Sequence, residues 1–191
     1  MDRDYKNQIV FDVRWRRLKK YRKDVLSVRY AALEEEIKRL CGALGLPDAC
    51  AQNAAELARR FVGRGHPPQA LAAAALFLSC RMLKAPRPLD DFADYVESLE
   101  KMKRVVRDLS ESVKSVPKHE HYVAVIAARL GVPAVAAKNA LELIQKNRRA
   151  LQGRNPWAAA AAALWLSGVD MFLLRQFASP SAIKIIARHI K

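Results

Sequence analysis

Two alanine-rich apolar blocks constrain the fold of this chain more than any other feature. The first block, at 69–81, reads QALAAAALFLSCR, and the second, at 157–167, reads WAAAAAALWLS. Each block is too apolar for a surface position, and its small side chains allow neighbouring helices to approach closely. Neither block reaches the roughly 18 consecutive apolar residues of a membrane span, so each predicts the central helix of a helical domain.

The sequence around the two blocks is repeated as well. The motif LGLP at 44–47 is matched by LGVP at 130–133, and Asn53 is matched by Asn139 at the same separation. From the glycine of the next turn onward the separation is slightly larger, which a longer loop in the later copy absorbs at little cost. A long repeat present twice predicts two similar domains, because a solenoid needs at least about three shorter units.

Apolar spacing, caps and prolines predict five helices in each copy. The expected helices of the first copy lie near 26–44, 47–61, 69–81, 89–96 and 98–113. Those of the second copy lie near 119–130, 133–147, 155–167, 169–177 and 180–191. In the helix that begins after Ser98, the residues expected to face inward are Leu99, Met102, Val106 and Leu109. The expected fold class is therefore all-α, with a basic arm at 1–23, a five-helix repeat at 24–114, a linker at 115–118 and a second repeat at 119–191.

Positive charge is concentrated at the two ends of the chain. The net charge of +15 divides into +5 over residues 1–40, −1 over 41–100 and +11 over 101–191. Such a distribution is typical of a protein that binds a phosphate backbone. The alternative, a lysine-rich surface of the thermophilic kind, usually balances the two signs in ion-pair networks. The one-sided excess therefore favours nucleic acid as a partner.

The most basic stretch, at 14–23, reads RWRRLKKYRK and contains no acidic residue. Aromatic Trp15 and Tyr21 are interleaved with its cations and can stack on a base while the cations reach phosphates. This composition suits a flexible arm; the alternative is an amphipathic helix that docks on its own domain. The cations of the arm are Arg14, Arg16, Arg17, Lys19, Lys20, Arg22 and Lys23.

The cysteines and histidines do not predict a metal site or a disulfide. Cys41, Cys50 and Cys80 are an odd, scattered set, and we expect them to be small buried residues. The histidines of the HEH motif at 119–121 are two positions apart, so they point to different sides of a helix and lack a third ligand.

Catalytic readings of the sequence are equally weak. Asp90 and Asp91 precede an apolar helical pattern and are best explained as first-turn charges. No glycine-rich phosphate loop is present, and the serines have no histidine base nearby in sequence. We therefore expect a protein that is not an enzyme and has no cofactor. Its polar start is not a signal peptide, which predicts a cytoplasmic location.

The repeated motifs resemble a known family. LGLP, the stretch GRGHPPQALAAAALFLSCR at 63–81, and the second copies LGVP and GRNPWAAAAAALWLS are similar to the two cyclin-type repeats of archaeal transcription factor B, the relative of eukaryotic TFIIB. The preceding segment from Arg14 to the LGLP motif is similar to the linker of that family. The resemblance extends from about Arg14 to the C-terminus.

This resemblance implies two five-helix repeats on a promoter that TATA-binding protein occupies. The first repeat would contact that protein and neighbouring DNA, and the last helix of the second would read the element upstream of the TATA box. Double-stranded promoter DNA and TATA-binding protein are the implied partners of a monomer that binds no membrane, and RNA polymerase is a further candidate through the arm.

The family pattern falls on particular side chains. Its reading helix corresponds to Ser181, Lys184 and Arg188, with His189 as an additional candidate. Arg64 and Arg154 match positions that face phosphates, and their alternative role is that of solvated turn residues. The basic helix of the first repeat offers Lys101, Lys103, Arg104 and Arg107.

Two departures from the family pattern affect the expected function. No cysteine-bearing zinc ribbon, the part that docks on polymerase, precedes the arm, which would suit a regulator or competitor rather than an ordinary initiation factor. The turn before the last helix is also shorter than in the family, so the reading helix would be placed differently. The alternative function is a cyclin-type module that binds a protein partner and has only non-specific affinity for nucleic acid.

Overall fold

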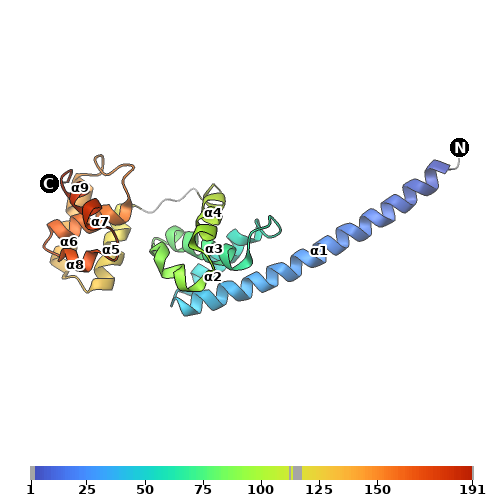
Figure 1. Cartoon of the computed structure of the whole chain (residues 1–191), viewed down its shortest axis with the longest axis horizontal. Coiled ribbons are helices and arrows are strands. Elements are labelled where there is room, and N and C mark those ends of the chain that lie inside the picture. Colours follow the sequence, from blue (N-terminus) through green and yellow to red (C-terminus); the bar gives the residue numbers. More distant parts are fainter. Residues whose placement is uncertain (1–2, 112, 114–117, 191) are drawn as a thin grey trace. The chain divides into compact units, whose positions relative to one another are not determined.

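The computed structural model describes the backbone of residues 3–111, 113 and 118–190, and the side chains of this set except those of residues 3–17, 22 and 23. Its elements are helices, and the described residues form no β-strand (Figure 1). In chain order they are α1 (Arg3–Ala43), α2 (Asp48–Arg59), α3 (Pro68–Met82), the 3₁₀ helix η1 (Leu89–Tyr95), α4 (Leu99–Ser110), α5 (His119–Leu130), α6 (Ala134–Lys146), α7 (Pro156–Leu166), α8 (Met171–Leu174) and α9 (Pro180–Ala187). The predicted all-α class is confirmed.

The chain forms two compact units. The first consists of Met1–Ser79 with Phe92–Ser112, and the second of Cys80–Asp91 with Val113–Lys191. Most of the expected linker lies outside the described residues. None of the described helices is both long enough and apolar enough to cross a membrane.

The first alanine block lies at the centre of the first unit. Ala72–Ala75 of α3 are fully buried, as are Leu76 and Ser79. The hydroxyl of Ser79 donates a hydrogen bond of 2.8 Å to the carbonyl of Cys50 and so ties α3 to α2. A buried hydroxyl needs such a partner, because leaving it unpaired would cost about 1–3 kcal/mol.

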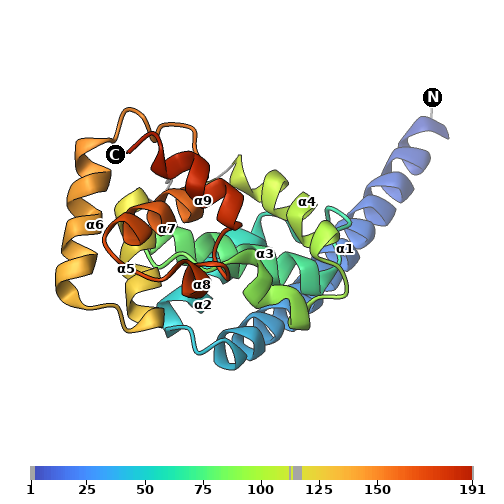
Figure 2. The same cartoon turned by 60° about the vertical axis from the view of Figure 1, so that its left-hand side comes forward.

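The second alanine block has the same role in the second unit. Ala158–Ala163 and Leu164 of α7 are at most 1% exposed, and α7 packs against α5, α6 and α9 (Figure 2). At the start of α7, the ring of Trp157 meets that of Tyr122 edge-on at 4.8 Å and stacks on Phe177 at 5.7 Å. The aromatic rings fill the space that the alanines leave at this end of the core.

Caps and prolines fix where several helices begin. The side chains of Ser98, Asn155 and Ser179 each accept a hydrogen bond from a backbone N–H of the helix that follows. Pro156 and Pro180 occupy the first turns of α7 and α9. Each cap contributes about 1 kcal/mol by satisfying a donor that the helix itself cannot satisfy. The cap-and-proline starts predicted from the sequence are confirmed.

The arm is helical, so the expectation of a flexible arm is wrong. α1 runs without a break from Arg3 to Ala43, because the arm contains no proline or glycine and is rich in the helix-favouring residues Arg, Lys and Leu (Figure 1). The docked alternative does not hold for the turn around Leu18 and Tyr21 either, since these side chains are 51% and 70% exposed. The residues of α1 that enter the core are Leu33, Ile37, Leu40 and Cys41.

Two further expectations concern buried side chains. The inward face of α4 consists of Met102, Val105 and Leu109, whereas Val106 is only half-buried. Assigning Val106 to the core was therefore wrong: both valines lie three or four positions from Met102 and Leu109, and the structure buries Val105. The expected burial of the three cysteines is confirmed, and all three are free thiols.

Candidate nucleic-acid interface

Helix α9 presents two chemically different faces. Ile183, Ile186 and Ile190 are buried in the core of the second unit. The opposite side exposes Ser181, Lys184, Ile185 and Arg188. At the start of the helix, the hydroxyl of Ser179 accepts from the N–H of Ala182 at 3.3 Å. A capped helix with a buried apolar face is thus held rigidly while its polar face meets solvent.

A second short helix precedes α9 and completes a helix-turn-helix arrangement. Asp170 caps α8 by accepting from the N–H of Phe172 at 2.9 Å. Leu174, which precedes the turn at 175–179, and Phe177 within it are both buried, and these two side chains attach the turn to the core. The guanidinium of Arg175 lies 5.5 Å from the ring centre of Phe172, which is 70% exposed. A short helix, a turn and an exposed basic helix form the arrangement that can enter a DNA major groove.

The other sequence-predicted residues of the second unit lie close to α9 or on a neighbouring loop. Arg188 is the C-terminal cap of α9, and His189 is exposed in the turn that follows. Arg154 is exposed after Gly153, whose φ of 75° favours glycine. The loop between α6 and α7 adjoins the C-terminal end of α9, since the side-chain amide of Asn147 donates to the carbonyl of Ile190 at 3.3 Å.

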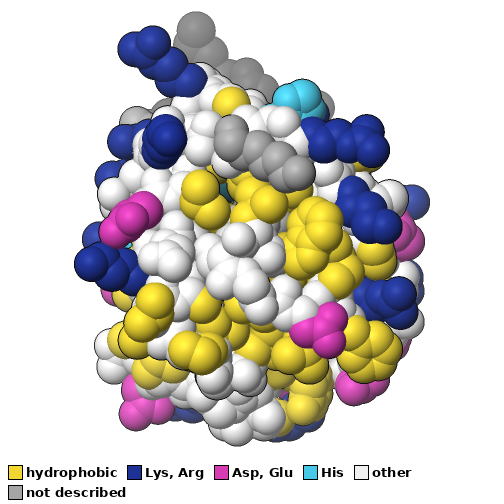
Figure 3. All heavy atoms as spheres, turned by 90° about the vertical axis from the view of Figure 1, so that its left-hand side faces the viewer, with side chains coloured by type: hydrophobic (Ala, Val, Ile, Leu, Met, Phe, Trp, Pro, Cys, Tyr) yellow, Lys and Arg dark blue, Asp and Glu magenta, His cyan; other side chains and the backbone are white. Residues whose placement is uncertain are grey.

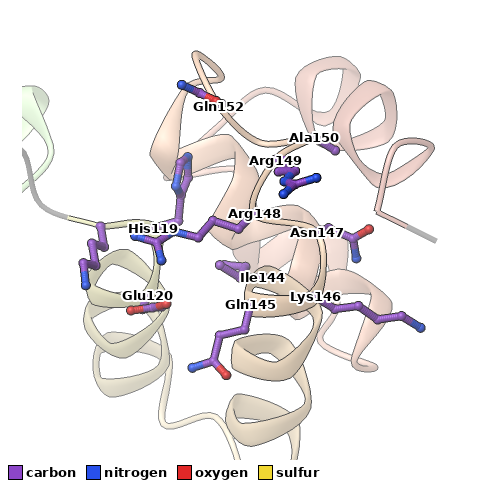
Figure 4. A pocket seen from close by; sticks show the side chains of 11 residues that line it. His119, Glu120, Ile144, Gln145, Lys146, Asn147, Arg148, Arg149, Ala150 and Gln152 are labelled. Atoms are coloured by element: carbon purple, nitrogen blue, oxygen red, sulfur yellow. The ribbon is translucent and has the colours of Figure 1, made fainter.

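A pocket of about 910 Å³ lies between the start of α5 and this loop (Figure 4). Four cations and one carboxylate line it, and its other lining residues include His119, Gln145 and Asn147. Burial lowers the pKa of His119, and the positive charge of Arg148 adds to the lowering. The hydrogen bond that the imidazole donates to the backbone carbonyl of Arg154 and the negative charge of Glu120 raise this pKa and so oppose the shift. The Nε2 atom of this imidazole is buried without a hydrogen-bond partner.

In the first unit, the side chain of Arg64 packs on an aromatic ring, unlike a side chain that contacts only solvent. Its guanidinium lies over the ring of Phe61 at 4.4 Å, while the residue remains exposed. The preceding Gly63 has a φ of 90°, and a Cβ there would come within 2.9 Å of Leu26 Cδ2. The turn therefore requires glycine, and within it the backbone N–H of Arg64 donates to the carbonyl of Phe61 at 3.2 Å.

The four cations of α4 are all exposed, but two of them are paired. Lys101 lies 3.3 Å from Glu97, and Lys103 lies 2.6 Å from Glu100, whose pKa is lowered by this hydrogen bond and by the positive charges of Lys103 and Arg104. Neither Arg104 nor Arg107 has an ion pair with a described residue. Surface pairs of this kind contribute about 0–1 kcal/mol, so all four cations can turn toward a phosphate at little cost.

The arm residues are described only in part. Lys19 and Lys20 are exposed on α1. The side chains of the other predicted arm cations lie outside the described set: Arg14, Arg16, Arg17, Arg22 and Lys23.

Sequence reasoning missed three features of these surfaces. Ile185 is exposed on α9, and its signal was an isoleucine that lies outside the spacing of the buried Ile183, Ile186 and Ile190. The pocket cations cluster around KNRR at 146–149, a run that was counted only in the net charge. Asp91 is in the first turn of η1 as expected, but it also accepts hydrogen bonds from Arg129, which no local pattern indicates.

No group of three or more His, Cys, Asp or Glu side chains that could hold a metal ion occurs among the described residues. The chemistry available at these surfaces is thus that of cationic donors, hydroxyls and a few exposed apolar groups.

Two units built around alanine-rich helices, with a helix-turn-helix at the end of the second, define a protein of the TFIIB-repeat class. Residues 27–111 match the family described as transcription factor TFIIB repeat. The chain is 32% identical over 146 residues to transcription initiation factor IIB of Pyrobaculum islandicum, and 34% identical over 145 residues to that of Pyrobaculum aerophilum. Each alignment covers 71% of this chain and 44% of the relative.

A third relative gives a similar result. The chain is 33% identical over 144 residues to transcription initiation factor IIB of Archaeoglobus fulgidus, which covers 70% of this chain and 44% of that protein. The chain thus spans less than half the length of these relatives. It is a TFIIB-like protein with the repeat core of the archaeal factors, as the sequence resemblance predicted.

Proposed function

We propose that this chain is a promoter-binding, TFIIB-like transcription factor that acts together with TATA-binding protein. The observation that carries the proposal is the exposed face of α9, where Ser181, Lys184 and Arg188 surround Ile185 while the isoleucines of the other face are buried. The relatives, named transcription initiation factor IIB, support the same role. On this proposal the repeats span 24–114 and 119–191.

Helix α9 has the dimensions and donors to read DNA. Its eight residues span about 12 Å, similar to the width of the major groove. Lys184 and Arg188 can donate to the O6 and N7 acceptors of guanine, and Ser181 can bond either a base or a phosphate. Each well-formed base contact contributes about 1–3 kcal/mol of discrimination.

The remaining basic residues have supporting roles in this proposal. Arg64 and Arg154 contact phosphates from turns that contain glycines with positive φ. The cations of α4 face TATA-binding protein and neighbouring DNA, and the arm is the candidate contact for RNA polymerase. Because phosphate contacts depend steeply on salt, these residues set the affinity while α9 sets the specificity.

The test is a gel-shift titration on a TATA-containing duplex, with and without TATA-binding protein, at two salt concentrations. The variant Lys184→Ala with Arg188→Ala should lose affinity for the promoter by roughly tenfold or more and bind scrambled DNA with a smaller loss. The matched control removes two exposed cations from elsewhere, as Lys38→Ala with Lys138→Ala. Equal losses on both duplexes would mean that α9 touches only phosphates.

One observation favours a second candidate, a cyclin-type module that binds a protein. Phe172 and Leu173 of α8 are 70% and 45% exposed. On the face of the molecule in Figure 3, apolar side chains gather in the centre, with Lys and Arg side chains around them. Weak, salt-sensitive DNA binding that TATA-binding protein does not strengthen would favour this function over promoter recognition.

A further inference from the structure

We propose that the pocket between the start of α5 and the α6–α7 loop is a binding site for the DNA phosphate backbone, distinct from α9. This inference rests on the proposed function. It adds a second contact in the second unit, one that none of the sequence motifs indicated. We call the pocket the α5/α6 pocket.

The charge of the α5/α6 pocket is unbalanced. Its cations are Lys118, Lys146, Arg148 and Arg149, and its single acidic residue is Glu120. All four cations are exposed, and none forms an ion pair with a carboxylate in the part of the chain that the structure describes. Cations without a carboxylate partner are free to form charge-assisted hydrogen bonds with a phosphate.

The shape and the local backbone of the pocket also suit an anion. The cations that line the pocket come from the N-cap of α5, the last residue of α6 and the loop that follows. Figure 4 shows Arg148 pointing from this loop toward His119 at the start of α5. Helix α5 has 12 residues and begins at the pocket, where its N-terminal N–H groups add positive potential. His119 is neutral near pH 7, because burial lowers its pKa, so it does not add to the charge.

The lining of the pocket favours phosphate over an acidic peptide. Ile144 and Ala150 are the only apolar residues among those that line it, so it offers little surface for an apolar side chain. Peptide recognition by a groove usually depends on such apolar anchors, whereas a phosphate diester needs only convergent donors.

The pocket is placed where DNA read by α9 would continue. Asn147 lines the pocket and donates a hydrogen bond of 3.3 Å to the carbonyl of Ile190, just beyond the end of α9. A duplex with α9 in its major groove extends past both ends of the helix. Phosphate contacts beside a reading helix fix its register on the duplex, which is the effect expected of Arg148 and Arg149 here.

The test compares Arg148→Ala with Arg149→Ala against the matched control Lys38→Ala with Lys138→Ala, both in the full chain. Fluorescence anisotropy with promoter and scrambled duplexes over a salt series gives the affinity and its salt dependence. The pocket variant should lose roughly tenfold in affinity on both duplexes, and the slope of log K against log salt should fall by about 1.8. Arg148→Lys with Arg149→Lys should keep the wild-type slope, because the charge remains.

Each other outcome contradicts the pocket proposal, the proposed function or both. If the pocket variant folds normally by circular dichroism and keeps the wild-type slope, while the α9 variant loses specificity, the pocket proposal is wrong and the proposed function stands. If the wild-type chain does not bind DNA, both are wrong. If the pocket variant loses binding to a poly-glutamate peptide but not to DNA, the pocket is a peptide site instead.

Discussion

Ile185 is an apolar side chain in the middle of a polar surface. It is 51% exposed on α9, next to Lys184. In a major groove the same side chain would meet the C5-methyl group of thymine, which is the apolar feature that distinguishes this base.

We expect Ile185→Ala to leave the thermal midpoint nearly unchanged, because exposed substitutions usually change stability by less than about 0.5 kcal/mol. It should weaken promoter binding by roughly fivefold or more. Replacing thymine by uracil in the duplex should weaken the wild type and not the variant. If the two proteins respond equally to uracil, Ile185 does not contact a thymine methyl.

His119 links the stability of the second unit to pH. Its pKa in the folded chain is lowered mainly by burial, so the unfolded chain binds more protons between this lowered value and the ordinary value of 6.5. Its neutral form therefore favours the fold fully above about pH 6.5, and this contribution is lost as the pH falls below that value.

The prediction is a thermal midpoint that falls as the pH is lowered from about 7.5 to about 5.5. In His119→Gln this fall should be smaller, whereas the exposed His189→Gln should behave like the wild type. An identical pH dependence in all three proteins would show that other groups are responsible.

At the scale of elements, the alanine-rich helices are the part of the fold that the sequence predicted best. The blocks gave the central helices, and the serine, asparagine and proline signals gave the starts of α4, α7 and α9. These signals are local, so they can be read without the fold. Contacts between distant residues cannot be read in this way, which is why the Asn147–Ile190 bond and the α5/α6 pocket emerged only from the structure.

Errors in the prediction have equally local causes. The assignment of Val106 to the core missed the true phase of α4 by one residue, and two adjacent valines give no signal to choose between them. We expected a flexible arm from its high positive charge, whereas the helix propensity of its residues favours the helix that the structure shows. Ser79 and Ser167, which end the matching stretches LFLS and LWLS of the two alanine blocks, show a further limit: Ser79 bonds to α2, whereas Ser167 bonds to Ala163 of its own helix.

We expect a larger side chain within α7 to be strongly destabilising. Ala160 is fully buried and α7 touches four other helices, so Ala160→Leu should cost about 1–3 kcal/mol or more through overpacking. Urea unfolding measures this cost, with Ala134→Leu on the exposed first turn of α6 as the control. If Ala160→Leu and Ala134→Leu have equal free energies of unfolding, the core of the second unit can accommodate a larger side chain, and the prediction is wrong.

Deletion of residues 1–23 should leave the first unit folded. The residues of α1 that enter the core begin at Leu33, so the deletion removes helix without removing any described core contact. We expect the thermal midpoint of the shortened chain to stay within a few degrees of the wild-type value. Loss of a cooperative transition would contradict this description of α1.

At the scale of the whole molecule, the chain corresponds to less than half of the length of its relatives. If it recognises a promoter through α9 as we propose, it should compete with a full-length archaeal TFIIB for the same DNA. Adding an excess of the chain to a transcription reaction should lower the output, and the α9 variant Lys184→Ala with Arg188→Ala should lower it less. Increased output with the wild-type chain would contradict competition and indicate an activator.

The unbroken course of α1 has a mechanical consequence. A helix of 41 residues is a rod about 60 Å long, so a partner bound near its beginning is held at a fixed distance and azimuth from the first repeat. A flexible tether would tolerate a one-residue insertion without effect. In a rod, the same insertion turns everything on its far side by about 100° and moves it about 1.5 Å along the axis. The arm therefore sets both the distance and the orientation of such a partner relative to the first repeat.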